Sequence, residues 1–308
     1  MCDLSNPIYN DKDKAREHLE AIRWPNGPVC PHCGVVGTAY PITGKSARPG
    51  LYQCKDCSKQ FSVTVGTVFE RSKIPLNKWL LATHLMTSSK KGVSSHQIHR
   101  SLGVTYKTAW FMTHRIREAM KDTSTGSLGG KGTSGIVEAD ETYFGKTKNK
   151  GKGSHSGKKQ KVVALVERKG KVRAFHLPTI TARTLKPVLT GNIDKNARLM
   201  TDSAGLYFRI GKVFKSHETV NHSIDECVRG DVTTNTVENY FSVLKRGING
   251  VYQHVSPAHL HRYVNEFSFR YNHRSDLEIS DSERANIALE GIGGKRLTYR
   301  RTAEQAGA

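Results

Sequence analysis

The sequence has no apolar run that approaches the roughly 18 residues a membrane helix needs. Its first twenty residues mix acidic and basic side chains and lack the basic and then apolar pattern of a secretory signal. No internal repeat is visible, and acidic residues are few, with 27 Asp and Glu against 48 Lys and Arg. We therefore expect no membrane span and no secretion, and we place the protein in the cytoplasm.

The positive charge is large and unevenly spread. The 308 residues carry a formal net charge of +21 at pH 7, and the excess lies between residues 71 and 275, because residues 1–70 and 276–308 are nearly neutral. Hydrophobic residues make up 36% of the chain, enough for the cores of two or three domains. Concentrated basic charge favours a polyanionic partner, most simply double-stranded DNA. A basic but otherwise ordinary protein remains the alternative.

Four of the six cysteines form two pairs. They are Cys30-Pro-His-Cys33 and Cys54-Lys-Asp-Cys57, with 20 residues between the pairs. This is close to the spacing of a zinc ribbon, in which each pair forms a knuckle and four thiolates bind one structural Zn²⁺. A redox site is the competing interpretation, but no β-α-β pattern surrounds either pair. His32 lies inside the first knuckle and is predicted to be a bystander. We place the ribbon at about residues 24–66 of an N-terminal segment, 1–70.

Residues 71–122 have the pattern of a helix-turn-helix. Ser94 and Thr105 can cap two helices separated by a turn at Gly103. The expected apolar face of the second helix consists of Ala109, Met112, Ile116 and Met120. The opposite face offers Lys107, Trp110 and His114. Such a helix can enter the major groove of DNA, and an ordinary helical hairpin is the alternative.

The remaining chain is predicted to contain a linker, an α/β domain and a tail. Residues 123–135 are rich in Gly, Ser and Thr and are expected to be a linker. Residues 136–275 show three strands joined by hairpins, then a helix and a further strand. This is the chain order of a ribonuclease H-like fold, which is one of several α/β folds that the pattern alone allows. Residues 276–308 have weak periodicity. The predicted fold class is α+β multidomain: a zinc ribbon, a helix-turn-helix and a ribonuclease H-like mixed α/β catalytic domain.

Three carboxylates occupy informative positions. Asp140 lies in the first strand of the α/β segment, Asp202 ends a later strand, and Glu238 lies on a helix with Lys245 two turns further on the same face. Strand ends of an open α/β sheet are where catalytic groups gather. Such a set can hold two Mg²⁺ or Mn²⁺ ions for phosphodiester displacement. Taken singly, each acid would be interpreted as a solvated surface residue, but the three together, in this order and on these elements, favour the metal site.

Other charged residues near these positions need separate interpretations. Glu138 shares the strand face of Asp140, whereas Glu141 lies on the opposite face, and either could be mistaken for the ligand. The segment 146–161 contains seven lysines and no acid, and we expect it to follow a DNA backbone. The predicted DNA-binding residues are Lys107, Lys146, Lys148, Lys150, Lys152, Lys158, Lys159 and Arg246.

Four stretches carry a resemblance to a known family. They are the cysteine pairs, VEADETYFGK from residue 137, LMTDSAGLY from residue 199, and the long run NTVENYFSVLKRGINGVYQHVSPAHLHRYVNEFSFRYNHR from residue 235. The chain resembles the DDE transposases of bacterial insertion sequences, in the ISXO-type group related to Merlin transposons. The resemblance covers roughly residues 15–275.

The resemblance implies roles for the acidic residues. Asp140, Asp202 and Glu238 would form the catalytic triad, and Lys245 would be the basic residue seven positions after the glutamate. Some members of the group use Asn as the third ligand, so Asn235 and Asn239 remain alternatives to Glu238.

The resemblance also implies the reaction. The protein would cut DNA at the ends of its element, join the freed 3′-hydroxyl to target DNA without a covalent enzyme intermediate, and act as a homo-oligomer at the bacterial nucleoid. A DNA-binding regulator, a domesticated transposase that no longer cuts, and a nuclease without strand transfer remain the alternatives.

Overall fold

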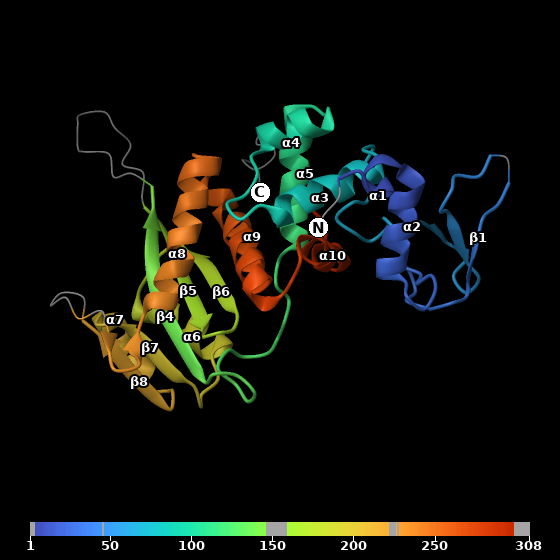
Figure 1. The fold of residues 1–308 in the computed structure, drawn as a ribbon. Coiled ribbons are helices and arrows are strands. Elements are labelled where there is room, and N and C mark those ends of the chain that lie inside the picture. Colours follow the sequence, from blue (N-terminus) through green and yellow to red (C-terminus); the bar gives the residue numbers. More distant parts are fainter. Residues whose placement is uncertain (1–3, 45, 146–158, 222–225, 227, 299–308) are drawn as a thin grey trace, which may run out of the picture. The chain divides into compact units, whose positions relative to one another are not determined.

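The computed structural model describes residues 4–44, 46–145, 159–221, 226 and 228–298 (Figure 1). The chain divides into two compact units. The first unit comprises residues 1–121 and 273–308, and the second comprises residues 122–272. Among these described residues, no helix is both long enough and apolar enough to cross a membrane.

The first unit combines a small antiparallel sheet with several α-helices. Its strands, in spatial order, are β1 (Ala39–Pro41), β2 (Tyr52–Cys54) and β3 (Gln60–Phe61). Its helices are α1 (Pro7–Asn10), α2 (Lys12–Arg23), α3 (Leu76–Ser88), α4 (Ser95–Leu102), α5 (Tyr106–Ala119) and α10 (Asp281–Glu290), with a 3-10 turn, η4 (Ser275–Leu277). Helix α10 packs on α3, so the two ends of the chain build this unit together.

Helices α4 and α5 begin and end where local signals predict. The hydroxyl of Ser94 accepts a hydrogen bond from the Gln97 amide at 3.2 Å, and that of Thr105 accepts one from the Thr108 amide at 3.3 Å. Gly103 ends α4 in the left-handed region, at φ +59°, which a glycine adopts without steric cost. The predicted apolar face of α5 is confirmed as buried: Ala109, Met112, Ile116 and Met120.

A helix forms within the segment expected to be a C-terminal tail. The buried Arg284 of α10 donates from Nη1 to the Thr87 carbonyl at 3.3 Å and from Nε to the His273 carbonyl at 2.5 Å. The buried face of α10 includes Ala285 and Ala288, whose small side chains produce little hydrophobic periodicity. Tertiary packing rather than a strong sequence pattern therefore accounts for this helix.

The second unit contains a mixed five-stranded sheet. Its strands lie in the order β6-β5-β4-β7-β8. Strand β4 pairs antiparallel with β5 and β5 with β6, whereas β4 and β7 are parallel, as are β7 and β8. The strands are β4 (Ile136–Phe144), β5 (Gln160–Glu167), β6 (Val172–Leu177), β7 (Arg198–Asp202) and β8 (Ser216–Val220). The predicted three-strand, helix, strand order is therefore confirmed.

Helices pack against both faces of this sheet. One core joins alternate residues of the sheet to α8 (Asn235–Gly247) and α9 (Leu260–Asn272), which lie side by side in Figure 1. A second core joins the other face to α6 (Ala182–Asn192) and α7 (Gly205–Gly211). The remaining elements are a hairpin of β9 (Val228–Arg229) and β10 (Val232–Thr233), a π-helix η2 (Ile248–Tyr252) and a 3-10 turn η3 (Pro257–His259).

Part of the segment expected as a linker belongs to the second core. Leu128 is buried and forms a parallel bridge with Ile193. The Gly129 amide donates to Oε1 of the buried Glu167 at 2.9 Å. A single apolar residue among Gly and Ser carries no periodic signal, so the sequence pattern could not indicate this packing.

Candidate functional site

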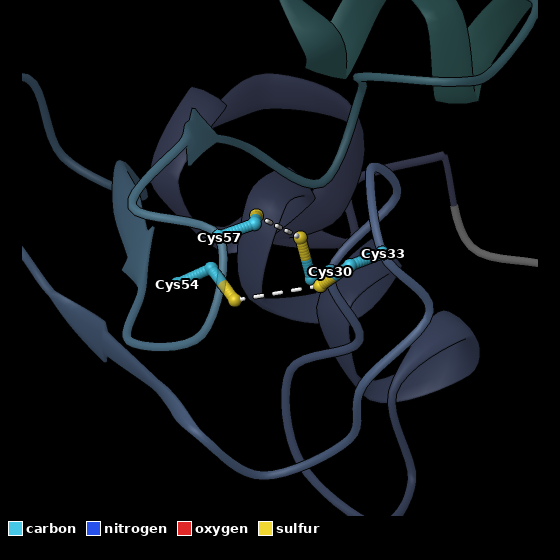
Figure 2. Close-up of side chains that lie close together, drawn as sticks. All are labelled: Cys30, Cys33, Cys54 and Cys57. Carbon is cyan, nitrogen blue, oxygen red and sulfur yellow. Dashed lines mark hydrogen bonds between the residues drawn. The ribbon is translucent and has the colours of Figure 1, made fainter.

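The four paired cysteines converge in the first unit. In Figure 2 their side chains point toward one another from the two knuckles. The Sγ atoms of Cys30 and Cys57 are 3.7 Å apart, and those of Cys33 and Cys54 are 3.6 Å apart. All four sulfur atoms lie within 4.8 Å of one another. The cluster predicted from the spacing is therefore formed.

The geometry of this cluster fits a tetrahedral zinc ion. Tetrahedral coordination with Zn–S bonds of about 2.3 Å places neighbouring sulfur atoms about 3.8 Å apart, close to the distances seen here. Burial disfavours the thiolate, but hydrogen bonds from the backbone amides of His32 and Cys33 lower the pKa of Cys30 below its usual value. The His32 side chain is exposed, with Nε2 3.4 Å from the Gln60 carbonyl oxygen, and it is not part of the cluster.

Asp140 and Asp202 lie at the same level of two neighbouring parallel strands. Ala139 of β4 pairs with Thr201 of β7, and each aspartate is the next residue along its strand. Residues at the same level of parallel strands project to the same face, and the strands are about 4.8 Å apart. That face is the one covered by α8, because Phe144, an even-numbered residue of β4, packs in the α8 core.

Glu238 completes the acidic site, by which we mean Asp140, Asp202 and Glu238. It lies in the first turn of α8, where its Oε1 accepts a hydrogen bond from the Thr234 hydroxyl at 2.8 Å. Burial raises the pKa of Asp140 to about 7. A hydrogen bond from the Glu141 amide opposes this shift, and the negative charges of Asp202, Glu141 and Glu238 add to it. The acidic residues therefore act on one another electrostatically.

The acidic residues do not form a tight ligand cluster. Within the part of the chain that the structure describes, the cysteines are the group of three or more potential ligand atoms within 4.8 Å of one another. Glu141 is an additional carboxylate close to the site. It points to the α7 face, where the Tyr207 hydroxyl donates to Oε2 at 2.5 Å. The predicted opposite orientations of Glu138 and Glu141 are confirmed.

The predicted cationic residues have different surroundings. Lys245 and Arg246 are exposed in the last turn of α8, and Arg246 donates from Nε to the Ser242 carbonyl at 3.2 Å. Lys107 is exposed near the start of α5, and Lys159 is exposed just before β5. The other predicted lysines lie outside the described residues: Lys146, Lys148, Lys150, Lys152 and Lys158.

One prediction about α5 is wrong. His114 was expected on the exposed face with Lys107 and Trp110, but its side chain is 1% exposed. Its ring packs edge-on against Trp110, with ring centroids 4.2 Å apart. The physical reason is that α5 contacts α3, α4 and α10, so it is covered on more than one side. A two-sided amphipathic pattern cannot describe such a helix.

Sequence reasoning missed two residues that contact the site's framework. Tyr207, which binds Glu141, is fully buried on α7. Arg168 follows β5 and donates to the buried carboxylate of Glu138. The alternation along β4 places Glu138 on the same face as Asp140, so its position near the site could be predicted. Nothing in the local sequence indicates that Glu138 pairs with Arg168.

Comparison with known proteins finds matches for two segments of the chain. Residues 132–272 match the ISXO2-like transposase domain, and residues 10–60 match the transposase zinc-ribbon domain. The chain is also 29% identical over 276 residues to an uncharacterized protein in the transposable element ISH50 of Halobacterium salinarum. That match covers 83% of this chain and 90% of the relative. The chain thus carries a segment that matches the ISXO2-like transposase domain, with a transposase zinc-ribbon match ahead of it, and these domains indicate a transposase role.

Proposed function

We propose that this transposase binds the terminal repeats of its insertion sequence, cuts the DNA by metal-dependent phosphodiester hydrolysis and joins the 3′-hydroxyl ends to target DNA. The observation that carries the proposal is the shared level of Asp140 and Asp202 on neighbouring strands, with Glu238 within electrostatic range. This set lies inside the segment that matches a transposase domain. The strand order β6-β5-β4-β7-β8 supports a ribonuclease H-like catalytic domain.

The acidic site would hold two Mg²⁺ or Mn²⁺ ions through Asp140, Asp202 and Glu238. Carboxylate oxygens are the ligands these hard cations prefer. Asp140 and Asp202 are half-buried and Glu238 is exposed, and mutually repelling carboxylates gain from a bound cation. When bound, the ions stabilise the attacking and leaving oxygens of the displacement. Lys245, exposed two turns beyond Glu238, would contact a DNA phosphate beside the scissile bond.

The rest of the chain would recognise and hold DNA. Helices α4 and α5 would form the DNA-binding helix-turn-helix, with Lys107 near the start of the recognition helix. The zinc ribbon would hold one structural Zn²⁺ through its four cysteines. Lys159, Arg246 and the other lysines expected to bind DNA would contact the backbone. Because two element ends must be processed together, we propose a homo-oligomer acting in the cytoplasm at the nucleoid.

The test is Mg²⁺-dependent cleavage of DNA spanning each end of the element. The wild type should make specific nicks, whereas Asp202→Asn should bind the same DNA with unchanged affinity and make none. The matched control is Asp194→Asn, which changes an aspartate whose Oδ1 accepts from the Asn196 amide at 2.8 Å in the turn before β7. It should cleave like the wild type. Specific binding without nicks by all three proteins would instead favour a regulator or a domesticated transposase.

A further inference from the structure

A buried carboxylate on β4 receives the first turn of the helix that carries Glu238. Glu138 lies two residues before Asp140 on the same face of the strand, and its side chain has 0% exposure. Its Oε2 accepts hydrogen bonds from the Thr236 amide at 2.8 Å and the Val237 amide at 3.1 Å. Its Oε1 accepts one from the Thr236 hydroxyl at 2.9 Å. One carboxylate therefore binds three donors of α8.

Arg168 links the same carboxylate to the chain that leads into α8. Its Nη2 and Nε donate to Oε1 of Glu138 at 2.9 and 3.1 Å. Its Nη1 donates to the Asp231 carbonyl at 2.9 Å, and Nη2 lies 3.4 Å from the Thr233 carbonyl. Asp231 immediately precedes β10 and Thr233 is its last residue, just before α8. The Glu138–Arg168 pair therefore contacts α8 and the segment that precedes it.

This contact replaces the local cap that most helices use. The first amides of a helix are usually satisfied by the N-cap side chain. In α8 the N-cap residue Thr234 makes no such bond, and its hydroxyl donates to Glu238 instead. The cap is supplied by Glu138, 98 residues earlier in the sequence. A negative charge is also favoured at this position by the helix dipole.

We propose that Glu138 and Arg168 are positioning residues of the acidic site. They hold the first turn of α8, and with it the backbone of Glu238, against β4 at a set position relative to Asp140. A buried ion pair can often be replaced by apolar groups at little cost in stability, so stability alone does not account for this pair. Mg²⁺ requires nearly ideal octahedral coordination, which makes ligand placement decisive. The expected effect of Glu138 and Arg168 on metal binding rests on the proposed function.

The first arm of the test needs no activity. In Glu138→Gln, one oxygen acceptor becomes an NH₂ group and the charge is lost. Hydrogen exchange at the Thr236 and Val237 amides should accelerate by about tenfold or more, because both amides lose a hydrogen bond to a charged acceptor. The matched control is Glu167→Gln, which alters another buried carboxylate of the same sheet that binds the Gly129 amide. It should leave both α8 amides unchanged.

The second arm measures the Mg²⁺ concentration that half-saturates DNA cleavage. It should rise several-fold in Glu138→Gln, with metal-free DNA binding and the control variant unchanged. A purely structural role would lower the amount of folded enzyme without shifting this concentration. Because a half-buried guanidinium left without its carboxylate can impair folding, the double variant Glu138→Gln with Arg168→Met is the second test. It should fold and show the same shift.

The outcomes separate the two proposals. Unchanged exchange at Thr236 and Val237 in folded Glu138→Gln would overturn the positioning role. So would accelerated exchange combined with a wild-type Mg²⁺ requirement. If the wild type cleaves no DNA but the exchange accelerates as expected, the proposed function fails, and the attachment of α8 to β4 through Glu138 is supported.

Discussion

The hydroxyl of Tyr207 donates a 2.5 Å hydrogen bond to Oε2 of Glu141, next to the acidic site. Burial raises the pKa of Glu141, this hydrogen bond opposes the shift, and the charge of Asp202 adds to it. The phenol on α7 therefore keeps a carboxylate on β4 closer to its ionised form. This hydrogen bond joins β4 to α7, which packs on the face of the sheet opposite to α8.

Replacing Tyr207 with Phe should raise the pKa of Glu141 further. The ring packing is kept and a donor to a buried carboxylate is lost, so the variant should lose about 1–3 kcal/mol of stability at pH 8. Because Glu141 is then more readily protonated in the folded state, the deficit should shrink as the pH falls toward 5. Urea unfolding at the two pH values, beside the wild type, measures this. An equal loss of stability at pH 8 and pH 5 would contradict the predicted rise in the pKa of Glu141.

Asp140 should make the metal-free protein less stable as the pH rises. Its pKa is raised from the ordinary value of 3.8 to about 7 in the folded state, mainly by burial. The folded state therefore holds an extra proton between these values, and the stabilisation present below pH 4 is lost as the pH rises through 7. This difference in pKa corresponds to a change in the free energy of unfolding of about 4 kcal/mol.

The variant Asp140→Asn isolates that effect. Asparagine can still accept the hydrogen bond that the Glu141 amide gives to Oδ1 at 2.7 Å. In EDTA at pH 8 the variant should unfold at higher urea concentration than the wild type, and the difference should vanish near pH 4. In Mg²⁺ the wild type should regain stability while the variant does not, and the variant should not cleave DNA. A wild type more stable than the variant at pH 8 in EDTA would refute the assignment.

Removing a buried ribbon cysteine should remove the zinc. Purified, reduced wild type should contain one tightly bound zinc per chain, measured by mass spectrometry of the metal. Cys54→Ala should contain none and should lose the folded ribbon, because metal binding supplies much of the folding free energy of such a domain. His32→Ala is the matched control and should keep its zinc. Loss of zinc from the His32 variant would place the histidine among the ligands.

Neutralising Lys107 should weaken DNA binding in a salt-dependent manner. If Lys107 contacts a phosphate, Lys107→Ala should reduce the slope of log affinity against log salt by about 1. Lys14→Ala is the control, because Lys14 is exposed on α2 and pairs with Glu17 at 2.9 Å. Binding titrations at several salt concentrations distinguish the two variants. Equal slopes for Lys107→Ala and the wild type would remove Lys107 from the interface.

Several features could be predicted because their signals are local. Ser94, Gly103 and Thr105 define the ends of α4 and α5 through contacts within a few residues. The cysteine spacing defines two knuckles, because each turn is short. Alternating residues of β4 assign Glu138 and Glu141 to opposite faces. Each of these inferences needs only backbone geometry and nearby hydrogen bonds.

The chain by itself therefore determined the cysteine cluster, the helices with their own caps and the strands that carry the aspartates. Tertiary structure alone decided the alignment of Ala139 with Thr201, the burial of His114 and the capping of α8 by Glu138. These relationships join residues far apart in the sequence. They depend on strand register and on which surfaces pack together, and no local periodicity encodes either one.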